Sequence, residues 1–337
     1  MTHVGVDLHE RFCYMTALDA TGRSLKAGTV ANQATELRRW LRGLPAPVEV
    51  AVEACSFWPA FQEAIADQVS VIHLVHPQRV KAIASAKLKN DRVDSATLAH
   101  LLRCNLLPEA WMADRATRER RQQVRLRISL GQHRAALKNQ VHAILHQHGK
   151  RSPATDTFGR KGREWLRKIA LPPEAREAVN TYGGLIDQVS QHIQRQEQRL
   201  KNMASGDARV KWLTSIPGVG TYSAMIILSE IGEVQRFGNA KALFSYAGLV
   251  PWVRESAGHK SRGGISRCGS PRLRWVMVEA AHTALRCSPA ARRYFDRLRK
   301  RKHAHVARVA LARKLLAAVF AMLRDGECFD ETIFATV

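Results

Sequence analysis

The apolar residues of this 337-residue chain change their spacing at about residue 115, and this change constrains the fold more than any other feature. Over residues 4–18 they alternate, as in Val4, Val6 and Leu8, which is the period of a β-strand with one buried face. Beyond residue 115 they recur at steps of three and four, the period of an amphipathic helix. The chain is therefore expected to combine a sheet-containing first part with a helical remainder.

The first part alternates short strands and helices. Residues 4–18 predict a hairpin that turns at residues 9–10, and a third strand is expected at residues 28–30. The later apolar runs predict a helix from Thr35 that Gly43 stops, a strand at 48–52, a helix at 58–69, a strand at 71–75 and a helix at 77–86. Three meandering strands followed by alternating helices and strands are the order of an α/β RNase H-like fold, although other α/β folds share the alternation.

Two long amphipathic stripes follow, at residues 126–144 and 185–203. The first predicts a helix that continues to about His148, and several helix breakers between residues 149 and 173 separate it from the second. Such a pair can form an antiparallel helical hairpin or an intermolecular coiled coil, so a plain spacer and an oligomerisation arm both stay open. We expect three domains: an RNase H-like domain at 1–112, a helical coiled-coil connector at 113–208 and a mainly α C-terminal domain at 209–337.

The charge of the chain indicates the class of partner. It carries 53 Lys and Arg against 29 Asp and Glu, a net charge of +24, so it repels itself unless a polyanion neutralises it, and nucleic acid is the expected partner. No apolar run approaches the roughly 20 residues that a membrane span needs. No signal peptide precedes the first strand, so we expect a cytoplasmic protein without membrane contact. Six scattered cysteines without a CxxC pair argue against zinc and against a disulfide framework.

Four acidic residues stand out in so basic a chain because of where they lie. Asp7 ends the first strand, Glu53 follows the strand at 48–52, and Asp91 and Asp94 open the next helix. The spacing of Asp91 and Asp94 puts both carboxylates on one face of that helix. Two neighbouring strand ends and one helix N-terminus can therefore bring four carboxylates to one place.

Four neighbouring carboxylates repel one another unless cations lie among them. Two hard divalent ions about 4 Å apart would satisfy these acids and would clamp the attacking and leaving oxygens of a phosphoryl transfer. Each acid also has an ordinary alternative role: Asp91 as a helix N-cap, Asp94 as a first-turn acid that the helix dipole favours, and Glu53 as a loop acid. The strand order and the net charge together favour the metal site.

A second region begins at Ser215-Ile216-Pro217-Gly218-Val219-Gly220, directly before a helix. A hairpin of this kind presents backbone N–H groups at a helix N-terminus, which suits a DNA phosphate near Gly218 and Gly220. A simple glycine turn between two helices is the alternative.

After Pro251 the chain is expected to enter a loop at residues 254–264, made of small, hydroxyl and basic residues. The basic side chains can contact DNA phosphates and offset the negative charge of a phosphoryl-transfer transition state. The residues that would do so are Arg254, Lys260, Arg262 and, just beyond the loop, Arg267. Serines of the loop can act as nucleophiles, and the residues alone do not decide between that role and a purely DNA-contacting loop.

Together these segments resemble the insertion-sequence one-ten family of transposases over nearly the whole chain. The motifs that carry the resemblance are Gly5-Val6-Asp7, Val52-Glu53-Ala54, Lys89-Asn90-Asp91-Arg92-Val93-Asp94-Ser95-Ala96, Ser215-Ile216-Pro217-Gly218-Val219-Gly220, and Tyr246-Ala247-Gly248-Leu249-Val250-Pro251 followed by Glu255-Ser256. The resemblance implies a bacterial recombinase with an N-terminal RuvC-like DEDD domain and a C-terminal transposase domain. Such an enzyme cuts and exchanges strands of donor and target DNA.

The resemblance also assigns residues and partners. It implies that Asp7, Glu53, Asp91 and Asp94 bind Mg²⁺, which Mn²⁺ can replace, and that Ser256 is the nucleophile that forms a covalent phosphoserine link to DNA. Ser261 competes for that role, and the position of Ser256 relative to the Gly-Leu-Val-Pro turn favours Ser256. A structured guide (bridge) RNA, action at the nucleoid, and a homodimer or homotetramer that combines two protomers in each active site are implied as well.

Two other functions fit parts of the sequence. The first is a RuvC-type junction nuclease, in which water attacks the phosphate and Ser256 is incidental. The second is an architectural nucleic-acid-binding protein, in which the acids are structural. A covalent protein–DNA adduct distinguishes the recombinase from the first, and specific magnesium binding distinguishes it from the second.

Overall fold

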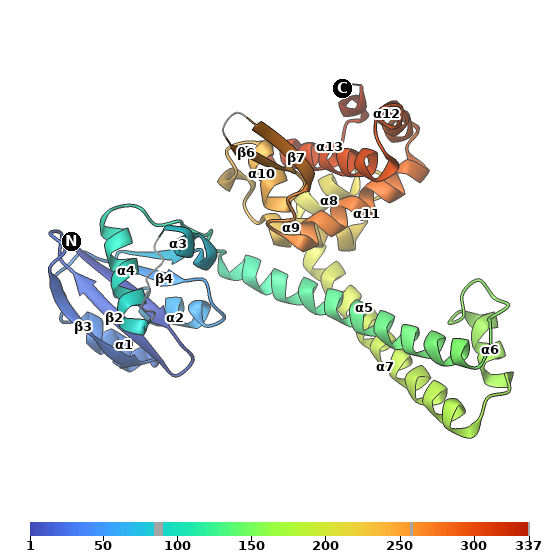
Figure 1. Ribbon diagram of the computed structural model, residues 1–337, viewed down its shortest axis with the longest axis horizontal. Coiled ribbons are helices and arrows are strands. Elements are labelled where there is room, and N and C mark those ends of the chain that lie inside the picture. The colour runs from blue at the N-terminus through green and yellow to red at the C-terminus, as the bar shows by residue number, and fades with distance from the viewer. Residues whose placement is uncertain (84–89, 257–258, 336–337) are drawn as a thin grey trace. The chain divides into compact units, whose positions relative to one another are not determined.

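The computed structural model describes residues 1–83, 90–256 and 259–335. The chain divides into two compact units, Met1–Ala113 and Asp114–Val337, which run from blue to teal and from green to red in Figure 1. The expected further division of the second unit into a connector and a C-terminal domain stays a prediction.

The first unit contains a five-stranded mixed sheet in the order β3-β2-β1-β4-β5. Strands β1, β2 and β3 pair antiparallel, whereas β4 and β5 continue parallel to β1. The strands are β1 (Thr2–Leu8), β2 (Phe12–Leu18), β3 (Ser24–Ala31), β4 (Val48–Glu53) and β5 (Val71–Val75), and the helices are α1 (Ala34–Leu41), α2 (Trp58–Ile65), α3 (Pro77–Ile83) and α4 (Asp91–Arg103). The expected mixed α/β order is confirmed, although β3 is longer than predicted and α2 ends four residues earlier. The predicted end of the helix at residues 84–86 lies outside the described residues.

The two faces of this sheet carry different helices because side chains alternate along each strand. On one face, Val6 and Val52 are fully buried and pack with residues of α1 and α2. On the other face, Ala51 packs with Leu98 and other apolar residues of α4. The parallel strands are therefore buried on both sides, as their apolar sequences require.

Helix α4 lies unusually close to β1, and Gly5 permits this. A Cβ atom at position 5 would lie 2.0 Å from the carbonyl oxygen of Ser95 and 2.4 Å from the backbone nitrogen of Ala99. The Ser95 hydroxyl also makes a buried hydrogen bond of 2.7 Å with the hydroxyl of Thr16 on β2. These contacts fix the position of α4 along the strand.

The second unit is mainly helical (Figure 1). Its elements are α5 (Arg115–Gln147), α6 (Arg160–Lys168), α7 (Pro173–Ala204), α8 (Ala208–Thr214), α9 (Thr221–Ile231), η1 (Val234–Arg236), α10 (Ala240–Ala247), β6 (Pro251–Ser256), β7 (His259–Ile265), α11 (Pro271–Cys287), α12 (Pro289–Arg299), α13 (Ala304–Asp325) and η2 (Glu331–Phe334). Among the described helices, none combines the length and the apolar content that crossing a bilayer demands.

Helices α5 and α7 pack side by side and run antiparallel. Near the start of α5, Arg127 forms an ion pair of 2.6 Å with Glu197 near the end of α7. At the opposite ends, Val141 of α5 packs with Val179 of α7. The two helices thus form an antiparallel hairpin within one chain, and whether it is a plain spacer or an oligomerisation arm stays a prediction.

The predicted loop at residues 254–264 is wrong for its described part, because residues 254–256 belong to β6 and residues 259–264 to β7, and the two strands pair antiparallel; residues 257–258 lie outside the described residues. Arg254 pairs with Ser261 and Ser256 pairs with His259. The sequence lacks the alternation of apolar residues that marks a strand, and main-chain pairing defines the ribbon instead. At its base, the ring of Trp252 lies against Gly263, where an added Cβ atom would come within 3.2 Å of it.

A buried carboxylate holds three parts of the second unit together. Glu230 of α9 is 3% exposed and forms an ion pair of 3.2 Å with Arg125 of α5. Its other oxygen accepts a hydrogen bond of 2.9 Å from Ser270, whose hydroxyl also caps α11. Removal of either partner of such a buried pair would leave the other charge unpaired. Glu230 therefore links α5 to Ser270, which follows β7 and begins α11.

We predict that Gly5→Ala lowers the free energy of unfolding by about 1–3 kcal/mol, because the added methyl group forces α4 away from β1. The matched control is Gly28→Ala on β3, where a Cβ atom meets nothing within 4 Å. Urea unfolding of both variants measures the difference. Equal stability of the two variants would show that the close approach of α4 is not required.

Candidate active site

Asp7 and Glu53 follow equivalent positions at the carboxyl ends of two neighbouring parallel strands. The register of β1 and β4 pairs Val6 with Val52, so Asp7 and Glu53 are the next residues along each strand. Since Val6 and Val52 point into the core under α1 and α2, alternation directs Asp7 and Glu53 to the face that α4 covers. The sequence prediction that these strand ends adjoin is confirmed.

The first turn of α4 supplies the other two acids. Asn90 caps this helix, since its side-chain oxygen accepts a hydrogen bond of 2.9 Å from the backbone N–H of Val93. The alternative role of Asp91 as the N-cap is therefore wrong. Asp91 and Asp94 lie in the first turn, where the helix dipole favours negative charge.

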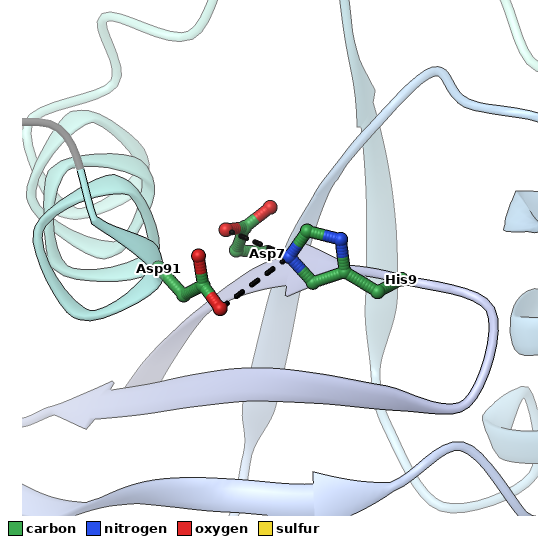
Figure 2. A group of neighbouring side chains, drawn as sticks. All are labelled: Asp7, His9 and Asp91. Carbon is green, nitrogen blue, oxygen red and sulfur yellow. Dashed lines mark ion pairs between the residues drawn. The ribbon is translucent and has the colours of Figure 1, made fainter.

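Asp7, His9 and Asp91 form one compact group. The Nε2 atom of His9 lies 3.4 Å from Oδ2 of Asp7 and 3.5 Å from Oδ2 of Asp91. Figure 2 shows one nitrogen of the imidazole ring directed toward both carboxylates, which come from β1 and α4. One potential ligand atom from each residue lies within 4.8 Å of the other two. The end of β1 and the start of α4 therefore bring three potential metal ligands together.

His9 is the residue of this group that the sequence reasoning missed. The pattern of apolar residues places His9 only in the turn between β1 and β2, which begins directly after Leu8. The signal that could have identified it is the spacing of two between Asp7 and His9, which keeps both side chains on one face of an extended segment.

The other two predicted acids lie next to this group and are not members of it. The set of donors within 4.8 Å, searched among the described residues, includes neither Glu53 nor Asp94. The negative charge of Asp94 nevertheless acts on Asp7 and contributes to its pKa. The register of β1 and β4 places Glu53 beside Asp7.

The electrostatics of the site are unfavourable without a cation. Burial raises the pKa of Asp7 above its ordinary value, and the negative charges of Asp91 and Asp94 raise it further, while His9 opposes the shift. The Nε2 atom of His9 is buried and makes no hydrogen bond to the described residues. Two carboxylates and the imidazole nitrogen that lies 3.4 and 3.5 Å from them are a donor set that a divalent cation would satisfy.

The β6–β7 hairpin carries most of the remaining predicted residues. Ser256 ends β6 with its backbone paired to His259. The side chains of Arg254, Ser256, Lys260 and Arg262 lie outside the described part of the structure, so their roles stay predictions. Arg267 is exposed after the hairpin, with a positive φ of 56°.

The two glycines before α9 differ in their surroundings. Gly218 has a φ of 91°, and a Cβ atom there would lie 2.8 Å from the carbonyl oxygen of Ala280 on α11. This close packing explains a glycine at position 218 without any DNA. Gly220 caps α9, is exposed and has open space around it. Phosphate binding at this helix N-terminus stays a prediction.

Two family models, both of transposases, match different parts of the chain. Residues 4–149 match the model of a DEDD transposase family, and residues 210–296 match the model described as "Transposase IS116/IS110/IS902 family". A probable family 20 transposase of Pseudomonas aeruginosa is 25% identical over 98% of both chains. The transposase for insertion sequence element IS1328 of Yersinia enterocolitica is 24% identical, over 98% of this chain and 99% of its own.

We predict that Asp7→Asn raises the free energy of unfolding at neutral pH when divalent cations are removed with EDTA. Because the folded protein raises the pKa of Asp7, ionisation of this carboxyl costs stability as the pH rises through that pKa. The gain should shrink as the pH falls toward the unfolded-state pKa of aspartate, about 3.9. Thermal unfolding across this pH range measures it.

The matched control for this prediction is Asp67→Asn. A hydrogen bond from Gln68, together with the charge of Arg38, lowers the pKa of Asp67, so removal of its charge should not stabilise the protein. A loss of stability in Asp7→Asn at neutral pH without cations would contradict the account of the site.

Proposed function

The chain belongs to the IS116/IS110/IS902 family of transposases, and from that premise we propose that it cuts DNA at a divalent-metal centre built on Asp7 and Asp91, with Ser256 as the nucleophile. Enzymes of this family catalyse DNA strand cleavage and transfer. The observation that carries the proposal is the group of Asp7, His9 and Asp91, which lies within the segment that matches the DEDD transposase model.

The proposed metal is Mg²⁺, with Mn²⁺ able to replace it. Asp7 and Asp91 would hold it, and Glu53 and Asp94 would complete the DEDD set of an RNase H-like, RuvC-like domain. When bound, such ions neutralise the scissile phosphate and orient the attacking and leaving oxygens. The grouping of Asp7, His9 and Asp91, with one potential ligand atom of each within 4.8 Å of the others, and the raised pKa of Asp7 support a site that favours a positive charge.

The protein's own residues prepare this site for an anionic substrate. Gly5 lets α4 approach β1, and the N-terminal turn of α4 holds Asp91 against Asp7. The Nε2 atom of His9 lies 3.4 Å from Asp7 and 3.5 Å from Asp91, so the imidazole contacts both carboxylates. Held in this way, the carboxylates need little rearrangement when a cation and a DNA phosphate arrive.

The proposed nucleophile is the hydroxyl of Ser256. Its oxygen forms a bond to the scissile phosphorus, the bond to one deoxyribose oxygen breaks, and the serine proton ends on the released strand. The phosphoserine link conserves the phosphodiester energy, so attack by a strand hydroxyl can reverse the step. Arg254, Lys260, Arg262 and Arg267 would offset the charge of the pentacovalent phosphate, a role that their place on and after the hairpin supports.

Assembly and guidance extend the proposal. A homodimer or homotetramer would combine the acidic site of one protomer with Ser256 of another, and the hairpin of α5 and α7 would serve as the arm between protomers. A structured guide RNA would select donor and target DNA at the nucleoid. The net charge of +24 supports two polyanionic partners.

Hydrolysis by a RuvC-type nuclease is the second candidate function. It is favoured by one observation: Asp7, His9 and Asp91, which form the group of potential metal ligands among the described residues, all belong to the first unit. In that case a water molecule would replace Ser256.

We predict that Asp91→Asn lowers magnesium-dependent DNA cleavage by about 100-fold or more, because the metal loses a direct ligand. Calorimetry with MgCl₂ should show specific binding to the wild type and none to the variant. Asp67→Asn is the control for a general loss of negative charge. Full cleavage by Asp91→Asn would remove the metal site from the proposal.

We predict that Ser256→Ala abolishes the covalent protein–DNA adduct, whereas Ser261→Ala retains it. Reaction with end-labelled DNA, followed by a denaturing gel, reveals the adduct as a shifted band. An adduct that survives in Ser256→Ala and disappears in Ser261→Ala would move the nucleophile to Ser261. Cleavage without any adduct in the wild type would support the hydrolytic function.

A further inference from the structure

A groove of about 820 Å³ lies at the base of the β6–β7 hairpin, between the hairpin and helices α10, α12 and α13. Its inner wall is apolar and combines Ile265 of the hairpin, Leu249 before it, Leu298 of α12 and Ala310 of α13. Val306 lies at the groove and is 52% exposed. The groove therefore offers an accessible apolar surface.

The side chains around this apolar wall are cationic. The basic residues of the lining are Arg267, Lys302, Arg313 and Lys314, together with His305, and none of the described residues that line the groove is acidic. The guanidinium of Arg313 lies 5.0 Å from the ring centroid of Phe244, so it caps an aromatic lining residue. A molecule that fits the groove must therefore place apolar faces against the inner wall and negative charges against the surrounding basic side chains.

Unpaired nucleotides have this combination, whereas a DNA duplex does not, because it hides the faces of its bases in the stack. Base faces packed on apolar side chains, with phosphates on surrounding cations, are the usual means of binding single strands. From this complementarity we infer that the groove binds unpaired bases of the DNA strand that is cut. Its volume leaves room for more than one base.

The choice of DNA rests on the proposed function. Strand β6 begins at Pro251, which lines the groove, and ends at Ser256. Five strand residues span about 17 Å, so a single DNA strand of a few nucleotides can reach from the groove to the end of β6. The groove would thus hold the strand on one side of the cut while the hairpin end meets the phosphate. The binding of an unpaired nucleic-acid strand by itself does not depend on Ser256.

The test uses the full-length Ser256→Ala protein in EDTA, so that neither cleavage nor a metal contributes to binding. Fluorescence anisotropy compares four labelled probes: a thymine oligodeoxynucleotide of about 12 nucleotides, an abasic strand of the same length, a duplex of that length and a uracil RNA strand. The abasic strand keeps every phosphate and lacks the bases. The expected result is that the thymine strand binds about tenfold more tightly than the abasic strand.

Two variants then change the groove in different ways. Val306→Glu places a negative charge on the apolar surface, and Ala310→Phe fills the groove while all cations stay in place. Both should reduce the preference for thymine over the abasic strand to near unity. Val71→Glu on β5, where the side chain is 44% exposed, makes the same substitution elsewhere and should retain the preference. Circular dichroism confirms that each variant is folded.

The outcomes separate the groove from the proposed chemistry. The inference would be overturned if the Ser256→Ala protein bound the thymine and abasic strands equally tightly. It would also be overturned if both groove variants kept the preference for the thymine strand. Tighter and groove-dependent binding of the RNA strand would replace DNA by RNA as the occupant and would likewise overturn it. Since the assay contains no metal and no Ser256, a failure of the proposed cleavage mechanism leaves the result intact.

Discussion

The close packing of α4 on β1 is the contact on which the candidate site depends. Because Gly5 has no side chain, the backbone of α4 at Ser95 can approach the strand, and the hydroxyl pair of Ser95 and Thr16 fixes its position. One turn before Ser95, the start of the helix brings Asp91 to Asp7. A strand end and a helix start that are more than 80 residues apart in the sequence thus share one site.

The grouping of acids around Asp7 makes the ionised form of this carboxyl unfavourable in the folded first unit. A half-buried carboxylate that faces two further acids has its pKa raised, and one imidazole compensates only in part. Shifted pKa values of this kind are common at functional sites, and the proposed ligand here is a divalent cation together with a DNA phosphate. The second unit uses its buried acid differently: Glu230 is matched by Arg125 and Ser270 and serves the packing of helices.

Much of this could be predicted from the sequence, for identifiable reasons. Alternation of apolar residues located β1 and β2, and the positions of Asp7 and Glu53 predicted that they adjoin, because parallel strands end on one edge of a sheet. Sequence spacing failed where main-chain geometry decides, as in the β6–β7 ribbon, whose strands are too polar for a periodic signal. It also failed for His9, because a residue just beyond a strand is easily assigned to the turn.

The proposed chemistry requires that Asp7 and Asp91 bind one divalent cation. The most direct measurement is diffraction from crystals soaked with Mn²⁺, recorded where manganese scatters anomalously. The account predicts an anomalous peak about 2 Å from carboxylate oxygens of both residues, with the His9 ring displaced or coordinated. Crystals that contain Mn²⁺ but show no peak there, with both ion pairs of His9 intact, would contradict it.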